Sequence, residues 1–504
     1  MTAMLGVLEV SLGVLIVVVL VVGLIYWYVQ DITQKKHVIL RNYPLIGHLR
    51  YFFEQLGEYF RQYFFLGDRE EMPFNRATRG WVYRLAKNEG GVVGFGSTYD
   101  LHHPGALIFV NAGFPVLDEN QVPTPPLAIG DGYAAQPFVA RSLINISGMS
   151  YGALSRPAVL ALSKGAAEAG CWMDTGEGGL APAHLEGGAD IIMQIGTAKY
   201  GVRDAQGQLS DERLRELAAH PTVRAFEIKL SQGAKPGKGG VLPGSKVTRE
   251  IAAIRGIPEG VDSISPNRHR DIANVNDLLD MIVRVRTVTG KPVGIKTAIG
   301  GRRFLHELCE AILRRGLDTA PDFIAVDGGE GGSGAAPQAL ADHMALSIDE
   351  ALPRVIDTLI EFGLRERIRV IAAGKLVTSA RAAWALACGA DFVNTARGFM
   401  FSLGCVQAMR CHQNTCPTGI TTHNAKLQRG LVVEEKYLRV ANYARNLNKE
   451  IDMIAHACGL QHAREFRREH VRLVQSGGRS EAFNMLYPYP EPFDGAPGRH
   501  GGLV

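Results

Sequence analysis

Eight short apolar runs alternate with helical patterns from residue 141 onward, and this alternation constrains the fold more than any other feature of the chain. Each run has the length of a β-strand, and most are followed by small or polar residues. Strands that alternate with helices form parallel sheets, and eight such units predict an α/β fold, a (β/α)8 barrel. The runs are Leu143–Ser147, Cys171–Asp174, Ile192–Ile195, Ala225–Leu230, Val293–Thr297, Phe323–Asp327, Arg369–Ala373 and Phe392–Thr395.

A doubly wound open sheet is the alternative to a barrel. That fold favours a G-x-G-x-x-G phosphate fingerprint after its first strand, and none follows Leu143–Ser147. The interval from residue 231 to 290 is too long for one crossover and must contain an insertion. The helical patterns between the runs are Ala158–Ala169, Val275–Thr287, Phe304–Arg315, Leu352–Phe362 and Ser379–Ala387.

The ends of the predicted strands are rich in glycine and charged residues, and the chemistry of a (β/α)8 barrel lies at those ends. Glycine lets backbone N–H groups approach a ligand closely, although each glycine alone is equally a turn former. The loops after strands seven and eight are the usual phosphate site, so a flavin mononucleotide (FMN) with its ring over the barrel mouth fits the pattern. The predicted FMN-binding residues are Ser147, Gly148, Met149, Ser150, Thr175, Gln194, Lys296, Asp327, Gly328, Gly329, Gly332, Gly374, Lys375, Ala396, Arg397 and Gly398.

Three cysteines, Cys405, Cys411 and Cys416, follow the last predicted strand in a C-x5-C-x4-C pattern. Three thiolates this close in sequence favour one soft metal centre over disulfides, because a single bridge leaves one cysteine over. They suit a three-iron cluster best, since a four-iron cluster needs one more ligand. Zinc is the alternative, but its usual signature is C-x2-C pairs, and His412 is the one adjoining candidate for a fourth ligand.

Residues 10–29 carry no charge and are long enough, at helical rise, to cross the hydrocarbon core of a bilayer. Aromatic residues 26–28 at the far end match an interfacial belt. A cleaved signal peptide would have a basic start, and a buried helix is rarely so uniformly apolar. Because Lys35, Lys36 and Arg41 follow the span and no basic residue precedes it, we expect a single-pass anchor in the plasma (inner) membrane with the catalytic domain in the cytoplasm.

The chain of 504 residues is long enough for one to three domains, and a net charge of +4 is too small to indicate a nucleic-acid partner. We expect a transmembrane signal anchor over residues 1–32 and an amphipathic, irregular lead-in over 33–140. The FMN-binding barrel with its iron–sulfur loop then spans 141–430, and C-terminal helices and a tail pack on it over 431–504. Within the lead-in, residues 38–66 predict one or two helices that lie on the membrane or, as we favour, pack as an aromatic clasp on the main domain.

The chain resembles the FMN-binding glutamate synthase family, namely the synthase domain in its compact single-chain branch. The matching strings are ISGMSYGALS, TGEGG, EIKLSQGAKPGKGG, LPGSKVT, DGGEGGSGAAP and GCVQAMRCHQNTCPTGI, and the match runs from about residue 141 to 460. The resemblance implies FMN and a [3Fe-4S] cluster, with a [4Fe-4S] cluster a lesser fit. It also implies reductive amination of 2-oxoglutarate to L-glutamate through 2-iminoglutarate.

The resemblance assigns roles to residues by position. Cys405, Cys411 and Cys416 match the cluster ligands, and Lys296 matches the lysine that stabilises the charge of reduced flavin. Cations are expected beside the two carboxylates of the oxoacid, whereas a lysine taken alone is more often a surface charge. The implied catalytic residues are Glu177 (at the ammonia entry), Lys229, Lys235 and Lys296, and the implied substrate-binding residues are Lys229, Gln232, Lys235 and Arg255.

The sequence departs from the large family members in four respects. No amidotransferase sequence is found, so we expect glutamine hydrolysis by a separate glutaminase, or the use of free ammonia. No second nucleotide-binding domain is found, so electrons are expected from an external donor: ferredoxin, a reductase subunit or quinone. The membrane anchor has no counterpart. Val241 stands where the larger enzymes carry glutamine near the substrate.

Two other functions stay open on these residues, as does a homo-oligomer. The first is a related flavin and iron–sulfur oxidoreductase acting on another small oxoacid or amine. The second is a non-catalytic subunit of a membrane complex.

Overall fold

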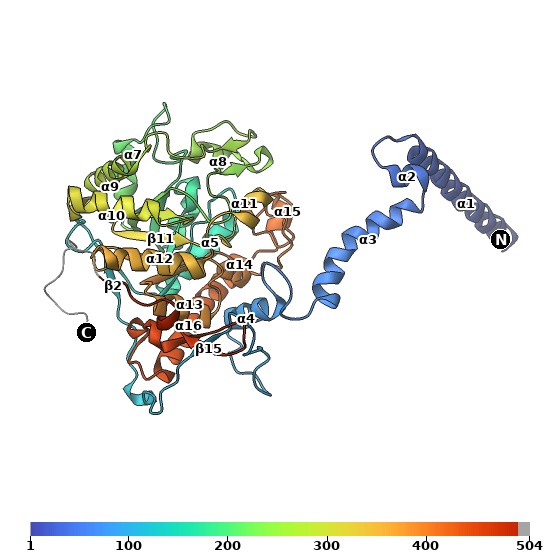
Figure 1. The fold of residues 1–504 in the computed structure, drawn as a ribbon. Coiled ribbons are helices and arrows are strands. Elements are labelled where there is room, and N and C mark those ends of the chain that lie inside the picture. The colour runs from blue at the N-terminus through green and yellow to red at the C-terminus, as the bar shows by residue number, and fades with distance from the viewer. Residues whose placement is uncertain (1, 492–504) are drawn as a thin grey trace. The chain divides into compact units, whose positions relative to one another are not determined.

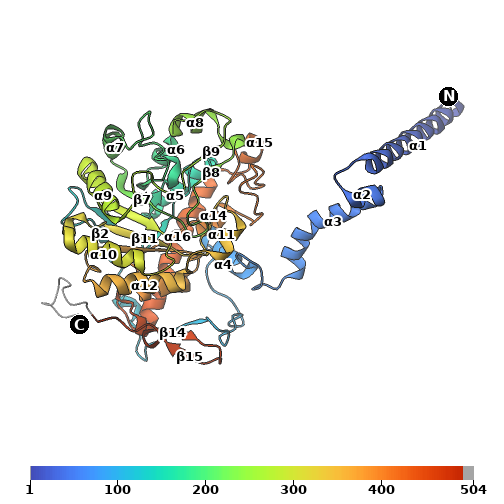
Figure 2. The ribbon, with the colours of Figure 1, turned by 45° about the horizontal axis from the view of Figure 1, so that its top comes forward.

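The computed structural model describes residues 2–491, which form two compact units divided between Arg79 and Gly80. The larger unit contains a mixed α/β body in which helices surround a central sheet (Figures 1 and 2).

Eight parallel strands close into a barrel at the centre of the larger unit, as the alternation of runs predicts. Each predicted run overlaps one of them, although the third and fourth strands begin two residues before their predicted runs. Every neighbouring pair around the ring is parallel. The fold is therefore a (β/α)8 barrel, and the open-sheet alternative is wrong. The strands are β4 (Ile144–Ile146), β5 (Trp172–Asp174), β6 (Asp190–Ile195), β7 (Val223–Lys229), β10 (Val293–Thr297), β11 (Phe323–Asp327), β12 (Arg369–Ala373) and β13 (Phe392–Thr395).

The helices around the barrel begin and end at residues with local reasons to do so. Helix α5 begins after Ser155, whose side chain accepts a hydrogen bond from the Ala158 backbone N–H, and it ends at Gly170 with a φ of 72°. The last long helix packs on α5, where a Cβ atom at Gly165 would lie 2.5 Å from Val440. The helices are α5 (Arg156–Ala169), α6 (Pro182–Gly187), α7 (Asp211–Ala218), α9 (Val275–Thr289), α10 (Arg303–Arg315), α12 (Ile348–Glu361), α13 (Ser379–Cys388) and α16 (Val433–Ala457).

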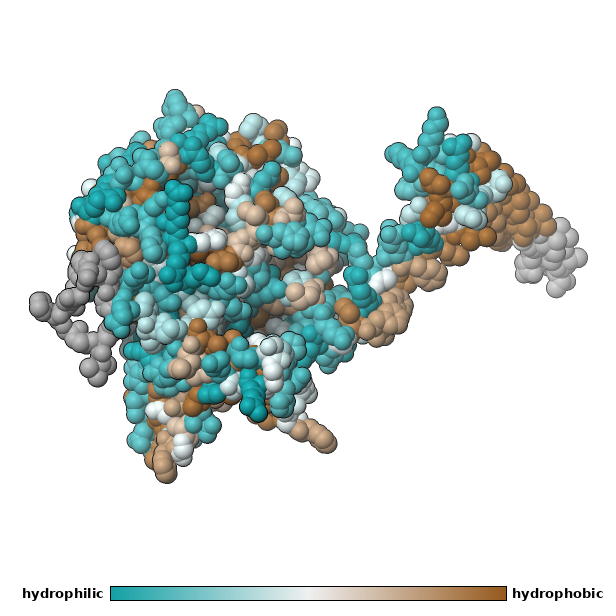
Figure 3. Space-filling view, in the orientation of Figure 1, coloured by the Kyte–Doolittle hydropathy of each residue, from teal (hydrophilic) through white to brown (hydrophobic). Residues whose placement is uncertain are grey.

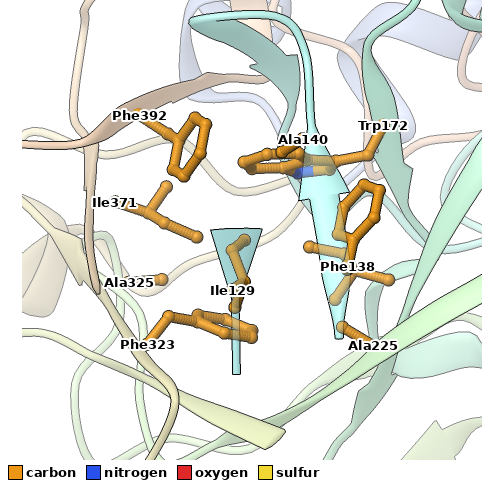
Figure 4. Packing of buried hydrophobic residues seen from close by; sticks show 10 residues of the cluster. Ile129, Phe138, Ala140, Trp172, Ala225, Phe323, Ala325, Ile371 and Phe392 are labelled. Atoms are coloured by element: carbon orange, nitrogen blue, oxygen red, sulfur yellow. The ribbon is translucent and has the colours of Figure 1, made fainter. Parts of the chain in front are cut away.

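A hairpin from the predicted lead-in closes the amino-terminal end of the barrel. Its strands, β2 (Leu127–Ile129) and β3 (Phe138–Ala140), pair antiparallel. Figure 4 shows Ile129 and Phe138 between residues that begin the barrel strands, among them Phe323. The ring of Phe138 meets that of Trp172 edge-on at 6.0 Å. Residues 80–140 thus belong to the barrel unit and help to form its core.

Other long-range pairings complete this unit. Strand β1 (Leu107–Phe109) pairs with β14 (Val471–Val474), which pairs in turn with β15 (Ser480–Ala482). After β7 comes the predicted insertion, which holds the antiparallel pair β8 (Val241–Leu242) and β9 (Ser263–Ile264). Between them lies α8 (Arg249–Arg255). The remaining short helices are α11 (Gln338–His343), α14 (Arg397–Leu403), α15 (Ala425–Gln428) and α17 (Phe483–Leu486), and α4 (Arg76–Lys87) spans the division between the two units.

The smaller unit is helical. Its first helix, α1 (Thr2–Thr33), contains a segment, Ser11–Thr33, that is long and apolar enough to cross a membrane by length and composition, with a mean hydropathy of 2.7. Hydrophobic side chains run along this helix in Figure 3. Helices α2 (Val38–Asn42) and α3 (Gly47–Phe60), which continues as a π-helix over Arg61–Phe65, match the helices predicted for residues 38–66.

The aromatic face of residues 38–66 is not buried by packing within the smaller unit. Its members Phe52, Phe53, Tyr59, Phe60 and Phe64 are all exposed. The prediction that this face forms a clasp on the main domain therefore stays a prediction, as does its contact with a membrane.

Candidate active site

The carboxyl ends of β5 and β7 bring three of the predicted catalytic residues together. The Lys229 Nζ atom lies 3.1 Å from Glu177 Oε2 and donates a hydrogen bond of 2.6 Å to Gln232 Oε1. Lys235, which is also buried, belongs to the loop after β7. Burial acts to raise the pKa of Glu177, but the charges of Lys229 and Lys235 outweigh it and the pKa is lowered. This end of the barrel therefore holds an ionised carboxylate among cations.

The loop after β7 is bound tightly to the loop after β11. The Gly233 backbone N–H donates to Asp327 Oδ2 at 2.9 Å, and Gln232 Nε2 donates to the Gly332 carbonyl at 3.3 Å. A Cβ atom at Gly233 would lie 1.7 Å from the Gly328 carbonyl oxygen, so only glycine allows the two loops to approach this closely. The predicted substrate loop and the predicted flavin loop are thereby held as one structure.

A buried polar cluster lies on the barrel strands beneath these loops. The Gln194 side chain donates to Glu227 Oε1 at 2.7 Å and to Asp174 Oδ2 at 3.3 Å, and the Gly176 backbone N–H donates to Asp174 Oδ1 at 2.7 Å. Burial, and then the charge of Asp174, raise the pKa of Glu227 well above its usual value. The Glu227 carboxyl therefore favours its protonated form more strongly than an exposed glutamate does.

The sequence prediction missed both carboxyls of this cluster. Glu227 occurs inside an apolar strand run and Asp174 ends one, and an acidic residue is rarely buried there without a partner. That mismatch between an acidic side chain and a buried strand was the available signal.

Lys296 belongs to the same interior and keeps its charge. Burial acts to lower the pKa of Lys296, but the carboxylates of Asp327, Glu227 and Asp174 outweigh it and the pKa is raised. Its Nζ atom lies 3.4 Å from Ser147 Oγ, at the end of β4. The structure therefore places a buried ammonium group at the centre of the barrel mouth.

The loop after β4 passes close to the buried polar cluster. A Cβ atom at Gly148 would lie 2.7 Å from Gln194 Nε2 and 2.8 Å from Asp174 Oδ1. The hydroxyl of Thr175 accepts a hydrogen bond of 3.0 Å from the Gln194 backbone N–H. Met149 is buried and Ser150 is half-buried. These residues line the same end of the barrel as Lys296.

Two cations lie at the ends of β12 and β13, where we predicted a phosphate. Burial, and then the neighbouring charge of Arg397, lower the pKa of Lys375, and burial lowers the pKa of Arg397 to about 10. The Arg397 Nη2 atom donates to the Glu330 carbonyl at 2.7 Å. A Cβ atom at Gly332 would lie 3.0 Å from Arg397 Nε. Because an anion would relieve the repulsion between the two cations, this pair suits a phosphate group.

The glycines of this region leave little room for other residues. Gly374 has a φ of 140°, which disfavours other residue types, and a Cβ atom at Gly398 would lie 2.3 Å from Tyr443 Oη. A Cβ atom at Gly328 or Gly329 would lie within 2.7 Å of neighbouring atoms. Ala396 immediately precedes α14. These close contacts hold the backbone of the strand-end loops in place beside Lys375 and Arg397.

Arg255 is engaged differently from the other predicted substrate residues. Its Nη2 atom donates to the Tyr151 carbonyl at 3.0 Å, and its Nη1 atom donates to Ser263 Oγ at 3.2 Å. Its guanidinium lies 5.1 Å from the centre of the Tyr200 ring. Its charge helps to lower the pKa of Glu177, but its contact with a substrate stays a prediction.

The structure brings two of the three predicted cluster ligands together. Burial raises the pKa of Cys411, and Cys416 lies close enough for its charge to help raise that pKa. The Cys416 Sγ atom lies 3.3 Å from Thr418 Oγ1. Burial acts to raise the pKa of Cys416, but hydrogen bonding of this kind outweighs it and the pKa is lowered. Within residues 2–491 no three Cys, His, Asp or Glu side chains are grouped so that they could hold a metal ion. Convergence of Cys405 with the other two thiols therefore stays a prediction.

A closed parallel barrel with charged, glycine-rich strand ends defines the class of this chain as that of the (β/α)8-barrel enzymes. The chain matches the model for the conserved region in glutamate synthase over residues 117–461. It is 43% identical over 483 residues to the glutamate synthase large subunit-like protein YerD of Bacillus subtilis, covering 88% of this chain and 91% of that protein. The chain therefore belongs to the glutamate synthase family and is a glutamate synthase-type oxidoreductase.

Other relatives are longer than the part of them that this chain matches. The archaeal glutamate synthase (NADPH) of Methanocaldococcus jannaschii is 38% identical over 346 residues, which cover 68% of this chain and 64% of that protein. Among solved structures, mandelate oxidase with (S)-4-hydroxymandelic acid aligns with a TM-score of 0.46 at 16% identity, over 79% of this chain and 97% of that chain. A likeness at that level carries no argument about function.

Proposed function

We propose that the chain is a membrane-anchored oxidoreductase, dependent on FMN and an iron–sulfur cluster, that reductively aminates 2-oxoglutarate to L-glutamate. The observation that carries the proposal is the ion pair of Lys229 and Glu177 beside Lys235 at the barrel mouth. Buried lysines offer charge-assisted hydrogen bonds to the carboxylates of an oxodiacid, and an ionised glutamate attracts the ammonium ion that supplies nitrogen. The name of the archaeal relative, glutamate synthase, is consistent with this reaction.

The strand-end residues fit FMN. Lys375 and Arg397 would hold its phosphate, and the loops that contain Gly328 and Gly332 would bring backbone groups against it. When bound, FMN supplies the electrons that reduce the imine. Lys296, held near Ser147, would provide a positive charge to the reduced flavin.

The remaining catalytic roles follow from the contacts of the side chains. Gln232 accepts a hydrogen bond from Lys229 and thus fixes the direction of its ammonium group. Lys229 and Lys235 would bind the substrate carboxylates, while Glu177 Oε2 would hold a proton of the incoming ammonium. Arg255 stays a proposed substrate cation, and its charge also keeps Glu177 ionised.

We also propose a [3Fe-4S] cluster held by Cys405, Cys411 and Cys416. The support is the soft chemistry of three thiols and the hydrogen bonds that favour the thiolate form of Cys416. A buried cation, Lys246, donates a hydrogen bond of 3.2 Å to the Cys411 carbonyl and would offset negative charge there. A [4Fe-4S] cluster fits less well, because it needs one more ligand.

The cellular setting is part of the same proposal. We place α1 across the plasma (inner) membrane as a single pass, with the barrel in the cytoplasm, on the support of its apolar length and of the basic residues Lys35, Lys36 and Arg41 after it. Electrons would come from ferredoxin, a reductase subunit or quinone, and nitrogen from a separate glutaminase or from free ammonia. A homo-oligomer stays open.

Val241 favours a second candidate function. Val241 lies on β8 and is 39% exposed. Its side chain is apolar, whereas the larger enzymes that the chain resembles carry glutamine at this position. The second candidate is the same chemistry on another small oxoacid or amine.

One experiment tests both candidates. The purified full chain is photoreduced without oxygen and mixed with a panel of 2-oxoacids, with and without ammonium, while flavin absorbance is followed. The proposal expects reoxidation by 2-oxoglutarate that depends on ammonium. Reoxidation by a different oxoacid alone would replace the first candidate with the second, and a protein that binds no flavin would contradict both.

A further inference from the structure

A cavity of about 1210 Å³ lies between the segment that leads into α7 and the insertion that contains α8 and β9. Figures 1 and 2 show α7 and α8 at the same end of the barrel unit. The cavity is larger than the roughly 300–1,000 Å³ of most small-molecule pockets. It is therefore roomier than a five-carbon diacid such as 2-oxoglutarate requires.

The lining of this cavity is strongly cationic. Its charged residues are Lys199, Arg203, Arg213, Arg255, Arg268, Arg270 and a lone carboxylate, Asp204. Asp204 is already used, because its Oδ1 atom accepts backbone N–H groups of its own loop from Gln206 and Gln208. Two of the cations are also compensated, since Lys199 pairs with Asp271 and Arg213 pairs with Glu216, each at 2.7 Å.

The other four cations of the lining are Arg203, Arg255, Arg268 and Arg270, and they form no ion pair in the part of the chain that the structure describes. Arg203 donates to the carbonyls of Arg255 and Gly256, and Arg268 donates to the carbonyl of Ile272 at 2.7 Å. Carbonyl oxygens satisfy hydrogen-bonding groups but do not cancel a full charge. Arg270 is exposed. The cavity thus concentrates positive potential that an anion would neutralise.

A second, independent observation also points to a ligand. Arg255 is 5% exposed and lines the cavity, yet its Nε–H has no hydrogen-bond partner. A buried donor left without a partner costs free energy, and an anionic oxygen in the cavity would satisfy it.

The cavity is distinct from the candidate active site. None of the residues assigned to FMN lines it, and neither do Glu177, Lys229, Gln232 or Lys235. Arg255 alone belongs to both sets. A ligand here would therefore act beside the reaction and not in it.

We propose that this cavity is a binding site for a small polyanion whose charge is carried by phosphate or carboxylate groups. Arginine binds both groups through paired hydrogen bonds, so the residues fit either chemistry. Arg268 and Arg270 supply uncompensated charge, and Arg255 supplies the buried donor.

The test is calorimetric titration of the full chain, in a non-ionic detergent at low salt, with pyrophosphate in one arm and citrate in the other. We expect saturable binding in at least one arm that weakens as salt is added. Binding in the pyrophosphate arm alone assigns a phosphorylated ligand, and binding in the citrate arm alone assigns a polycarboxylate. No saturable binding of either probe up to millimolar concentration would overturn the proposal.

Matched variants locate the binding. Arg270→Gln changes an exposed side chain and should not disturb folding. The double variant that combines Arg270→Gln with Arg268→Gln should weaken binding of the probe about tenfold or more, the usual value of one charge-assisted hydrogen bond. Arg314→Gln, on α10 outside the cavity, is the control and should bind as the wild type does. Unchanged binding in the double variant, or competition of the probe with 2-oxoglutarate, would refute a separate site.

Discussion

Replacing Gly233 with alanine tests whether the loops after β7 and β11 form one catalytic surface. The new Cβ atom would lie 1.7 Å from the Gly328 carbonyl oxygen, whereas unstrained contacts of carbon are about 3.5 Å. The loops would have to separate, which would break the 2.9 Å hydrogen bond from the Gly233 N–H to Asp327. Overpacking costs roughly 1–3 kcal/mol, and the loss of a hydrogen bond to a charged group costs about 1.5–3 kcal/mol. We therefore expect the free energy of unfolding to fall by about 2.5–6 kcal/mol.

The assay is the Tm of the purified chain, measured by tryptophan fluorescence, together with its FMN content and the rate of reoxidation by the oxoacid. Gly233→Ala should lower the Tm by several degrees and impair both cofactor retention and rate, because displacements of about 1 Å already cost about a hundredfold in rate. Gly334→Ala is the control, since a Cβ atom there meets nothing within 4 Å. If Gly233→Ala kept the Tm and rate of the wild type, the contact between the loops would be refuted.

Phe138→Ala should lower the free energy of unfolding by about 3–5 kcal/mol, measured as a fall in the Tm. Val139→Ala, at the exposed neighbouring residue, is the control and should leave the Tm unchanged. Cys411→Ser should lose iron and acid-labile sulfide but keep FMN, and full retention of iron would contradict the cluster assignment. Burial and a neighbouring carboxylate raise the pKa of Glu227 in the folded protein above the unfolded value of 4.5. The contribution of Glu227 to the free energy of unfolding is therefore fully present below pH 4.5 and is lost as the pH rises through the folded pKa. The Tm of Glu227→Gln should therefore increase relative to the Tm of the wild type as the pH rises. A difference in Tm that does not change with pH would contradict this. Deleting residues 1–33 should release the protein from membranes, and a truncated chain that still pellets at high salt would assign anchoring to α3.

The barrel was predictable because its signal is local. Each strand is an apolar run and each helix a period of 3.6 residues, and the parallel order follows from their alternation. The same logic places Ser147, Lys229 and Asp327 at strand ends, where the structure has them. The family was likewise recognisable in short strings, because those strings occupy the loops at the barrel mouth.

What the sequence left undecided depends on partners distant in the chain. The β2–β3 hairpin is read as irregular until the amino end of the barrel, with Phe323 and its neighbours, supplies the apolar surface that buries it. Strand β1 finds β14 across more than three hundred residues, and no local period reports such a pairing.

Only the tertiary structure decided the electrostatics of the site. Asp174 and Glu227 belong to different strands, and the high pKa of Glu227 arises because the barrel brings the two carboxyls together away from water. The resemblance gives Arg255 as a substrate cation, and the fold adds that it is buried against Tyr151 and also lines the cationic cavity. Composition and hydrophobic periodicity can be read from neighbouring residues in the sequence. Desolvation and charge pairing arise only when residues distant in the sequence are packed together in the folded protein.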